Sequence, residues 1–300
     1  MLDQPLVSVI INCFNGENYL SQSLESVISQ KYKNWEIIFW DNQSTDNSSK
    51  IFKSYNDNRF KYYLADKHTK FLYEARNYAL QKANGDFIAF LDTDDWWTPD
   101  KLETQISLFE DPKVGLVYGN LWYQFQKKNK KKILKNKLLP TGEILHELLK
   151  DYVIRSATMI VRQKCLESLK YKFNNRFHII GDFDLNIRIA AGWKIDCVQT
   201  PIAFVRIHGK NESLLNKDRE INEFKEWYNE MKNDRIISSN LNFDKIPLKI
   251  SYLEIIESIL KDKFSKNFLK VVKYPFSFNK VKLIVALFLP KFILKKIKNY

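Results

Sequence analysis

Short apolar runs alternate with amphipathic stretches over the first 112 residues of the chain. Runs rich in β-branched and aromatic residues are typical of buried strands, and they lie at residues 6–11, 35–40, 59–66 and 86–91. Between them, apolar residues recur every three or four positions, as on one face of a helix; these stretches lie at residues 15–30, near residue 46, at 72–85 and after Pro99. This alternation predicts an α/β fold in which helices cover both faces of a mostly parallel sheet.

Three residues predict where these helices begin and end. Asn15 is a residue type that caps the start of a helix, here the first one. Gly85 is placed to stop the third helix, because glycine commonly follows a helix C-terminus. Pro99 suits the first turn of the next helix, where its missing N–H is not needed.

The pattern loosens after residue 112. The stretch "VGLVYGNLWYQF" indicates a strand followed by an extended segment, and "SATMIVR" indicates another strand. A short helix is expected in "GEILHELLKD" and a longer one in "GDFDLNIRIAAG", whereas "WKIDCVQTPIAFVRIHG" predicts two short strands. From residue 218 onward the chain is expected to be helical and amphipathic.

Polar clusters follow three of the expected strands. They occupy residues 12–15, 41–46 and 92–95. In open parallel sheets, ligands bind beyond the carboxyl ends of the strands. Three separate segments therefore deliver acidic and amide groups to one rim of the sheet, which we interpret as a ligand site.

Two aspartates that flank one residue, Asp92 and Asp94 around Thr93, end the apolar run at 87–91. Clustered carboxylates repel one another, so a cation or a ligand that carries one is expected among them. Both carboxylates can reach a hard divalent cation such as Mg²⁺ or Mn²⁺, which prefers oxygen ligands and shares them with substrate phosphates. A cation on a diphosphate would stabilise charge as that leaving group departs.

Asp41 follows the second expected strand directly. It is either a turn or cap residue, or an acceptor for a base N–H or a ribose hydroxyl. The sequence contains neither G-x-G-x-x-G nor G-x-x-x-x-G-K-[ST], so neither glycine-rich phosphate cradle is expected. If a nucleotide binds, side chains and a cation must hold its phosphates.

The composition, 45% hydrophobic and 28% charged, fits a globular protein with a core. Cys13, Cys165 and Cys197 are far apart and odd in number, so neither a disulfide framework nor a metal-binding cysteine set is expected, and a reducing compartment is favoured. We expect no secretory signal at the N-terminus and no membrane-spanning helix, because no apolar run is long enough.

The positive charge is uneven. Residues 261–300 hold eleven lysines and one acid, and therefore +10 of the net charge of +13. Within this segment, residues 265–300 predict either an amphipathic basic helix on an anionic membrane or a helix packed on the protein or in an oligomer interface. No nucleic-acid motif accompanies the charge. Seven lysines at 126–137 are interpreted as a solvated loop or hairpin tip.

Four ordered motifs between residues 5 and 213 resemble glycosyltransferase family 2, whose fold is GT-A. They are "VSVIINCFNGENYLSQSLESVISQKYKNWEIIFWDNQSTDNS", "EARNYALQKANGDFIAFLDTDDWWTPDKL", "GDFDLNIRIAAG" and "VRIHGKNES". The chain departs from the family at one position, because Gly181 stands where the family often has a glutamate before Asp182.

The resemblance implies a role for individual residues. Nucleotide binding falls to Cys13, Phe14, Asn15, Asp41, Arg76, Asp92, Thr93 and Asp94, with Asp41 at the base and Asp92 at the ribose. Asp94 would bind a divalent cation, with His208 as a second candidate ligand. Asp182 would be the general base; Asp184 is the alternative, because the expected glutamate is absent.

Several of these residues also have plain structural explanations. Trp96 and Trp97 either belong to the core or form a stacking wall for a sugar ring, and Asp95 would share that pocket with Asp184. Arg206 pairs with a phosphate or with a surface acid. Asp182 and Asp184 could be present only because acids in a first helical turn are favoured by the helix dipole.

The resemblance therefore implies an inverting, metal-dependent glycosyltransferase that uses a nucleotide-diphospho-sugar, expected to be a UDP-sugar. The acceptor is expected to be a glycan or lipid-linked glycan in surface polysaccharide synthesis, at the cytoplasmic face of a membrane. We expect a GT-A domain at 1–215, with a nucleotide-binding part (1–112) and an acceptor-binding part (113–215), and a helical basic region at 216–300.

Two alternatives remain at this point. A phosphatase of the haloacid dehalogenase type has acidic motifs similar to "DTDDW" and "GDFD". It would, however, carry the first of them after the opening strand and would not have Trp96 in the Thr/Val position. A non-catalytic protein that binds membrane surfaces is the other alternative.

Overall fold

A computed structural model describes residues 4–209, 211–261, 264–290 and 293–294 of the chain. It divides into two compact units, Met1–Asn211 and Glu212–Tyr300.

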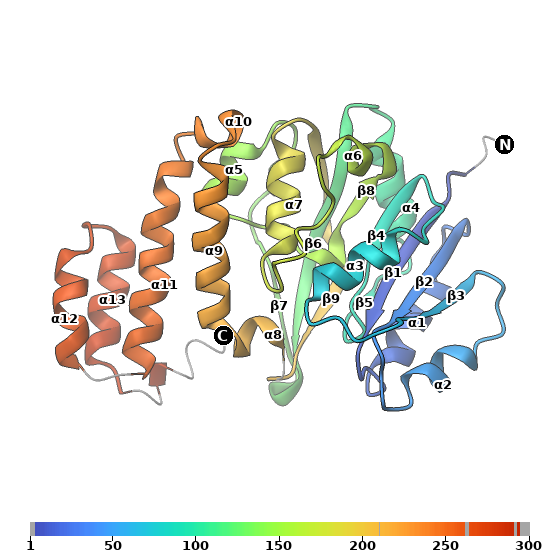
Figure 1. Ribbon diagram of the computed structural model, residues 1–300, viewed down its shortest axis with the longest axis horizontal. Coiled ribbons are helices and arrows are strands. Elements are labelled where there is room, and N and C mark those ends of the chain that lie inside the picture. The colour runs from blue at the N-terminus through green and yellow to red at the C-terminus, as the bar shows by residue number, and fades with distance from the viewer. Residues whose placement is uncertain (1–3, 210, 262–263, 291–292, 295–300) are drawn as a thin grey trace. The chain divides into compact units, whose positions relative to one another are not determined.

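The first unit is built on a single mixed sheet, which contains nine strands within the described residues (Figure 1). The strand order is β3-β2-β1-β4-β8-β6-β9-β5, and β7 pairs with β6 outside this path. The strands are β1 (Val7–Cys13), β2 (Trp35–Asp41), β3 (Phe60–Leu64), β4 (Phe87–Phe90), β5 (Trp96–Trp97), β6 (Val114–Phe125), β7 (Lys130–Ile133), β8 (Ile160–Arg162) and β9 (Lys194–Ile207).

Strands β3, β2, β1 and β4 run parallel, as the alternation of apolar runs and helices predicts. Val7 of β1 pairs with Trp35 of β2 and with Phe87 of β4, so the three strands start level. Cys13 and Asp41 are partners at the other end. The carboxyl ends of these strands therefore meet at one rim, which brings the polar clusters together.

Helices pack on both faces of this parallel half. Alternate residues of β1 and β2 join the main core with apolar residues of α1, α2 and α4. The opposite face meets α3, where the rings of Trp40 and Tyr78 stack with centroids 5.6 Å apart. The helices of the unit are α1 (Leu20–Ile28), α2 (Ser48–Lys53), α3 (Leu72–Leu80), α4 (Lys101–Ile106), α5 (Leu145–Lys150), α6 (Gln163–Ser168) and α7 (Gly181–Ala190).

The other half of the sheet is mixed. Strand β8 runs antiparallel to both β4 and β6, and β6 pairs in parallel with β9. The expectation of two short strands after Trp193 is wrong, because β9 is one strand of 14 residues. Pro201 interrupts the apolar pattern of this segment, and the sequence therefore suggested two strands. In the structure, a register shift between Gly119 and Asn120 of β6 keeps β6 and β9 paired past Pro201.

Two of the helix signals in the sequence have other causes. Asn15 does not cap α1: its backbone is left-handed (φ 55°), and its side-chain Oδ1 accepts a hydrogen bond from the N–H of Thr45 at 2.8 Å. Gly85 does not end α3, which stops at Leu80. A Cβ at Gly85 would lie 2.6 Å from the backbone nitrogen of Ser8, so glycine permits the chain to pass close to β1.

The lysine-rich segment at 126–137 contains the tip of the β6–β7 hairpin, as the sequence predicts, and strand β7 itself. Asn129 takes the left-handed conformation there (φ 45°). Cys13, Cys165 and Cys197 are buried free thiols.

The second unit is helical within its described residues. Its helices are α8 (Glu212–Leu215), α9 (Lys217–Met231), α10 (Arg235–Ser238), α11 (Ile246–Lys261), α12 (Phe264–Lys273) and α13 (Phe278–Phe288). Helices α11, α12 and α13 lie side by side (Figure 1) and share a small core that includes Ile259, Val271 and Leu283. Among the described helices, none combines the length and the apolar character needed to cross a bilayer.

Candidate functional site

The end of β2 presents Asp41 at the rim of the sheet. Its two carboxylate oxygens accept hydrogen bonds from the N–H of Ser44 (2.8 Å) and the hydroxyl of Tyr62 (2.7 Å). Burial and the adjacent carboxylate raise the pKa of Tyr62 to about 12, so this hydroxyl stays protonated as a donor. Asp41 is therefore fixed in position, and Tyr62 is a partner that the sequence did not reveal.

The loop after β1 contributes the predicted group Cys13, Phe14 and Asn15. Cys13, the last residue of β1, is buried, and burial raises the pKa of its thiol. It is therefore a packing residue. Phe14 is 53% exposed, and its ring lies 4.5 Å from the ring of His68. The N–H of Asn15 donates to Ser44 Oγ at 3.0 Å, which ties this loop to the loop after β2.

Asp92, at the end of β4, forms an ion pair with Arg76 of α3 at 2.5 Å. The Arg76 guanidinium is almost fully buried and also donates to Ser156 Oγ at 2.7 Å. The nearby Asp92 raises the pKa of Arg76 against the cost of its burial, so the arginine stays charged. The structure thus brings together two residues that are 16 positions apart and that the sequence assigned to one nucleotide site.

Asp94 meets His208, the second predicted metal ligand, across the same rim. Asp94 Oδ2 and His208 Nε2 are 2.9 Å apart. Burial and the charge of Asp92 raise the pKa of Asp94, and the hydrogen bond with His208 opposes this shift. Thr93 lies beside the β1 loop, because a Cβ at Gly16 would come within 2.9 Å of Thr93 Oγ1.

Asp95 differs from its neighbours because its carboxylate is buried and already bound. Its Oδ1 accepts the backbone N–H of Arg206 at 2.9 Å, and the Arg206 Nε donates to the carbonyl of Asp94 at 3.0 Å. Burial raises the pKa of Asp95 well above its usual range, and the charges of Asp94 and Asp92 add to this effect. Asp95 thus fastens β9 to the acidic turn, a position that favours a structural role over contact with a sugar.

The two tryptophans occupy different environments. Trp96 is half-buried and stacks on Phe204 with the ring centroids 4.9 Å apart, and the Arg206 guanidinium lies 4.6 Å from its ring. Trp97 is 3% exposed, lies in the main core, and donates its indole N–H to the carbonyl of Ala157. Burial favours the core explanation for Trp97, whereas Trp96 remains a candidate wall of the site.

Asp182, the predicted base, lies in the first turn of α7 and is half-buried. Its Oδ1 accepts hydrogen bonds from the N–H of Phe183 (2.8 Å) and from the hydroxyl of Tyr73 (3.2 Å). Burial raises the pKa of Asp182, while the positive charges of Arg76 and Arg155 and these hydrogen bonds oppose the shift. A carboxylate whose pKa is raised toward neutrality is a better proton acceptor, as a general base requires.

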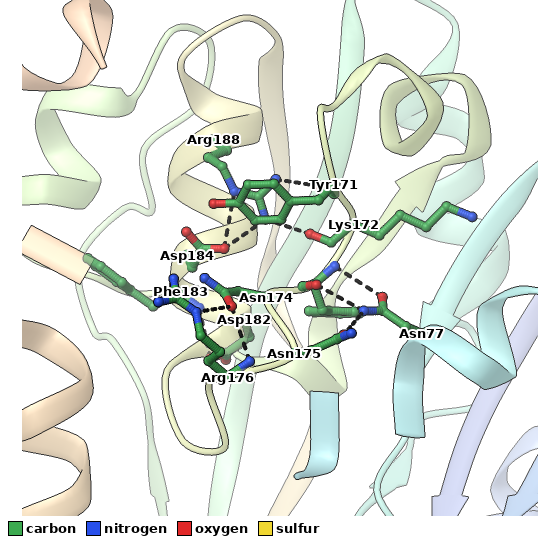
Figure 2. Close-up of polar contacts among 11 residues, drawn as sticks. Asn77, Tyr171, Lys172, Asn174, Asn175, Arg176, Asp182, Phe183, Asp184 and Arg188 are labelled. Carbon is green, nitrogen blue, oxygen red and sulfur yellow. Dashed lines mark hydrogen bonds and ion pairs between the residues drawn. The ribbon is translucent and has the colours of Figure 1, made fainter. Parts of the chain in front are cut away.

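Asp184, the alternative base, is fully buried and serves another purpose. Its Oδ2 pairs with Arg188 one turn further along α7 at 2.8 Å. Arg188 also donates to the carbonyl oxygens of Tyr171 (2.7 Å) and Lys172 (2.5 Å), as Figure 2 shows. This arrangement ties the segment before α7 to the helix and favours a structural role for Asp184.

A chain of contacts joins the two acidic parts of the site. Asp92 pairs with Arg76, the Arg76 guanidinium lies 5.2 Å from the ring of Tyr73, and Tyr73 donates to Asp182. The sequence did not reveal Tyr62, His68, Tyr73, Arg155 or Tyr19, whose ring stacks on that of His208 with centroids 5.5 Å apart. They are aromatic or basic residues without a motif of their own, and only their place in the fold reveals them.

The donor chemistry at Asp94 and His208 suits a divalent cation such as Mn²⁺, which accepts carboxylate oxygen and imidazole nitrogen. The two donor atoms already converge. Across the described residues, no group of three or more His, Cys, Asp or Glu could hold a metal ion. Any cation here would need further oxygen ligands from a bound diphosphate and from water. Mg²⁺ usually binds to proteins in this way, through few side chains together with substrate phosphates and water.

The arrangement of sheet, rim and helices is that of the GT-A fold, because solved GT-A glycosyltransferases superimpose on most of the chain. A mannosyltransferase from Pyrobaculum calidifontis, solved with GDP-Man and Mn²⁺, matches 99% of this chain and 85% of its own at a TM-score of 0.65 and 15% identity. TarS from S. aureus, solved with UDP-GlcNAc, matches 97% and 91% at 0.62 and 15%. At these identities the likeness shows the fold.

The family follows from sequence. The model of glycosyl transferase family 2 matches residues 8–178, more than half of the chain, and the chain belongs to this family. It is therefore a glycosyltransferase, which overturns both the phosphatase alternative and the non-catalytic one.

Two curated relatives from Escherichia coli are similar to part of the chain. WfgD, described as a UDP-Glc:α-D-GlcNAc-diphosphoundecaprenol β-1,3-glucosyltransferase, is 35% identical over 172 residues, which are 57% of this chain and 66% of WfgD. WfaP, with the same described activity, is 40% identical over 119 residues, 40% and 47% of the two chains. The chain thus matches less than two thirds of the length of either relative.

Proposed function

We propose that this glycosyltransferase moves a sugar, with inversion, from a UDP-sugar to a hydroxyl of a lipid-linked glycan, and that it depends on a divalent cation. One observation carries the proposal: the Asp94–His208 pair and Asp182 belong to one connected site, through Asp92, Arg76 and Tyr73. Transfer needs both parts within reach of one substrate.

The nucleotide is expected at the ends of β1 and β2. Asp41 is held where it can accept an N–H from the base, and the exposed ring of Phe14 offers an apolar face beside it. Asp92 lies next along the rim, where the ribose would follow. The UDP-sugar in the names of WfgD and WfaP supports a uridine nucleotide.

The diphosphate is expected beside Asp94 and His208, which would hold the cation. When bound, such a cation stabilises the negative charge of a departing diphosphate. Arg206 lies beside Asp94, because its Nε donates to the Asp94 carbonyl, and its guanidinium is 4.4 Å from the ring of Tyr19. Arg206 would therefore add a positive charge near the diphosphate.

Asp182 performs the proton transfer. As the acceptor oxygen attacks the anomeric carbon, its proton passes to the Asp182 carboxylate, the bond from that carbon to the diphosphate oxygen breaks, and the electron pair leaves with UDP. A single displacement inverts the anomeric centre. No covalent intermediate on the protein is needed.

The acceptor and the location are supported by the second unit. The face of α13 formed by Val281, Val285 and Phe288 is exposed, although Leu283 and Ala286 of the same helix are buried in the small core. Phe276, between α12 and α13, is 91% exposed, and Phe278, the first residue of α13, is 74% exposed. Residues 264–290 contain lysines and no acids. We assign this basic apolar face to an anionic membrane at the cytoplasmic side, where a lipid-linked acceptor would reside.

Calorimetric titration of UDP with and without Mn²⁺ tests the proposed function. The wild-type protein should bind UDP tightly only with Mn²⁺, and Asp94→Asn should lose this dependence. Asp100→Asn is the matched control, because Asp100 is an exposed acid six residues further on with no side-chain cap hydrogen bond. Binding of UDP that ignores both Mn²⁺ and the Asp94 substitution would contradict the proposal.

A further inference from the structure

Gly181 lies at the start of α7, directly before Asp182. A Cβ at this position would lie 2.3 Å from Cδ2 and 2.4 Å from Cγ of the Tyr73 ring, closer than real Cβ atoms approach. Gly181 does not have a positive φ. Glycine is therefore required here for space and not for backbone conformation.

Tyr73 fills the space that Gly181 leaves. The side chain is 3% exposed, and its ring packs on Phe173 with centroids 5.0 Å apart. Its hydroxyl donates to Asp182 Oδ1 at 3.2 Å, and the N–H of Phe183 donates to the same oxygen. Across the described chain, both hydrogen bonds to the Asp182 carboxylate end on Oδ1, so Oδ2 is left to accept a proton.

We propose that Tyr73 is a positioning residue for Asp182, and that the absence of a side chain at Gly181 gives the Tyr73 ring the space to reach this carboxylate. Tyr73 fixes Oδ1 and thereby presents Oδ2 to the acceptor hydroxyl. The ring is held by Phe173 and by the guanidinium of Arg76, which in turn binds Asp92. The orientation of the base is thus coupled to the nucleotide side of the site.

The charged and titratable groups around Asp182 come from several segments. Arg76 and Tyr73 reach it from α3, and Arg155 and Tyr152 from the segment after α5. Both arginines and the Tyr73 hydroxyl stabilise the ionised carboxylate. Removal of that hydroxyl therefore raises the pKa of Asp182, and the protein must reach a higher pH before the base is ionised.

The inference rests on the proposed role of Asp182 as the base, and Tyr73→Phe tests it. The ring stays and the hydroxyl is lost, so the acidic limb of the kcat/KM profile should move up by about one pH unit, with about tenfold lower kcat/KM below the limb. The affinity for UDP should be unchanged. Tyr118→Phe is the matched control, because its buried hydroxyl donates to the carbonyl of Pro140 at 2.8 Å, and the acidic limb of this variant should stay in place.

A second pair of variants tests the role of glycine. Gly181→Ala must displace the Tyr73 ring, so it should shift the acidic limb in the same direction as Tyr73→Phe. Gly192→Ala is the control, because a Cβ there meets nothing within 4 Å; it should leave the profile unchanged. A Gly181→Ala protein that folds with a wild-type profile would overturn the inference.

Carbon-13 NMR of labelled aspartate carboxyl groups separates this inference from the proposed function. The Asp182 resonance, assigned by its absence in Asp182→Asn, should titrate at a higher pH in Tyr73→Phe than in the wild type, with no substrate present. An unshifted titration would overturn the positioning role. A shifted titration in a protein whose Asp182→Asn variant turns over normally would uphold the contact and reject Asp182 as the base.

Discussion

The two acidic segments of the site are residues 92–95 and the first turn of α7. Each contains closely spaced aspartates whose side chains have different surroundings. In each, one carboxylate is buried and bound to a fixed partner: Asp95 to the N–H of Arg206, and Asp184 to Arg188. In each, a neighbour is half-buried and faces the site: Asp94 and Asp182. The buried member holds a segment in place, and the half-buried one is the residue to which we assign contact with substrate.

The segments differ in what holds them. Residues 92–95 follow a strand and are fastened by β9, whereas Asp182 begins a helix and is fastened by Tyr73 of α3. The first has a histidine opposite an acid, an arrangement suited to a cation. The second has arginines and a tyrosine around one acid, an arrangement suited to proton transfer.

The largest effect is expected at Asp182. Asp182→Asn keeps the shape and removes the base, so kcat should fall by about 10²- to 10⁴-fold, while calorimetry should show unchanged UDP binding. Wild-type kcat in this variant would assign the base elsewhere.

Asp184→Asn should lower the stability of the protein, whereas Asp182→Asn should lower kcat. The Asp184 substitution leaves the buried Arg188 without its negatively charged partner, and the free energy of unfolding should fall by about 3–5 kcal/mol in urea titrations. Asp151→Asn is the control, because Asp151 pairs with Lys135 at the surface, where an ion pair contributes about 0–1 kcal/mol. A stable Asp184→Asn protein with no turnover would indicate that Asp184 is the general base and that Asp182 is structural.

At the other segment, His208→Ala removes one of the two proposed cation ligands. The affinity for UDP in the presence of Mn²⁺ should fall by about 10- to 100-fold, with little change in its absence. His146→Ala, an exposed histidine of α5, is the control. Equal losses with and without Mn²⁺ would show that His208 acts by packing.

The smallest effect is expected away from both segments. Phe276→Ser together with Phe278→Ser should weaken binding to vesicles containing anionic lipid by about tenfold in flotation assays, and leave activity on a soluble acceptor unchanged. Leu241→Ser, which changes another highly exposed apolar residue of the same unit (76% exposed), is the control. Vesicle binding that is insensitive to the phenylalanines would remove this face as the membrane contact.

Much of the fold was predictable because the apolar runs of β1, β2 and β4 and the helices between them follow simple periodicities. The convergence of Asp41, Asp92 and Asp94 was predictable because parallel strands end together. The expected helix-end roles of Gly85 and Asn15 were wrong because contacts with residues distant in sequence determine their conformation. Gly85 lets the chain pass close to β1, and Asn15 accepts a hydrogen bond from Thr45. Gly181 was visible in the sequence, but the close approach of the Tyr73 ring was not, because the two residues lie more than 100 positions apart in the chain.

The central claim is that Asp94 and His208 hold a cation that binds the diphosphate of the donor. A crystal soaked with Mn²⁺ and UDP and measured for anomalous scattering tests this most directly. We predict one manganese peak within about 2–2.5 Å of Asp94 and His208, with the UDP phosphates completing its ligands. A nucleotide bound at the rim with no manganese there, or manganese held elsewhere, would rule out this cation site.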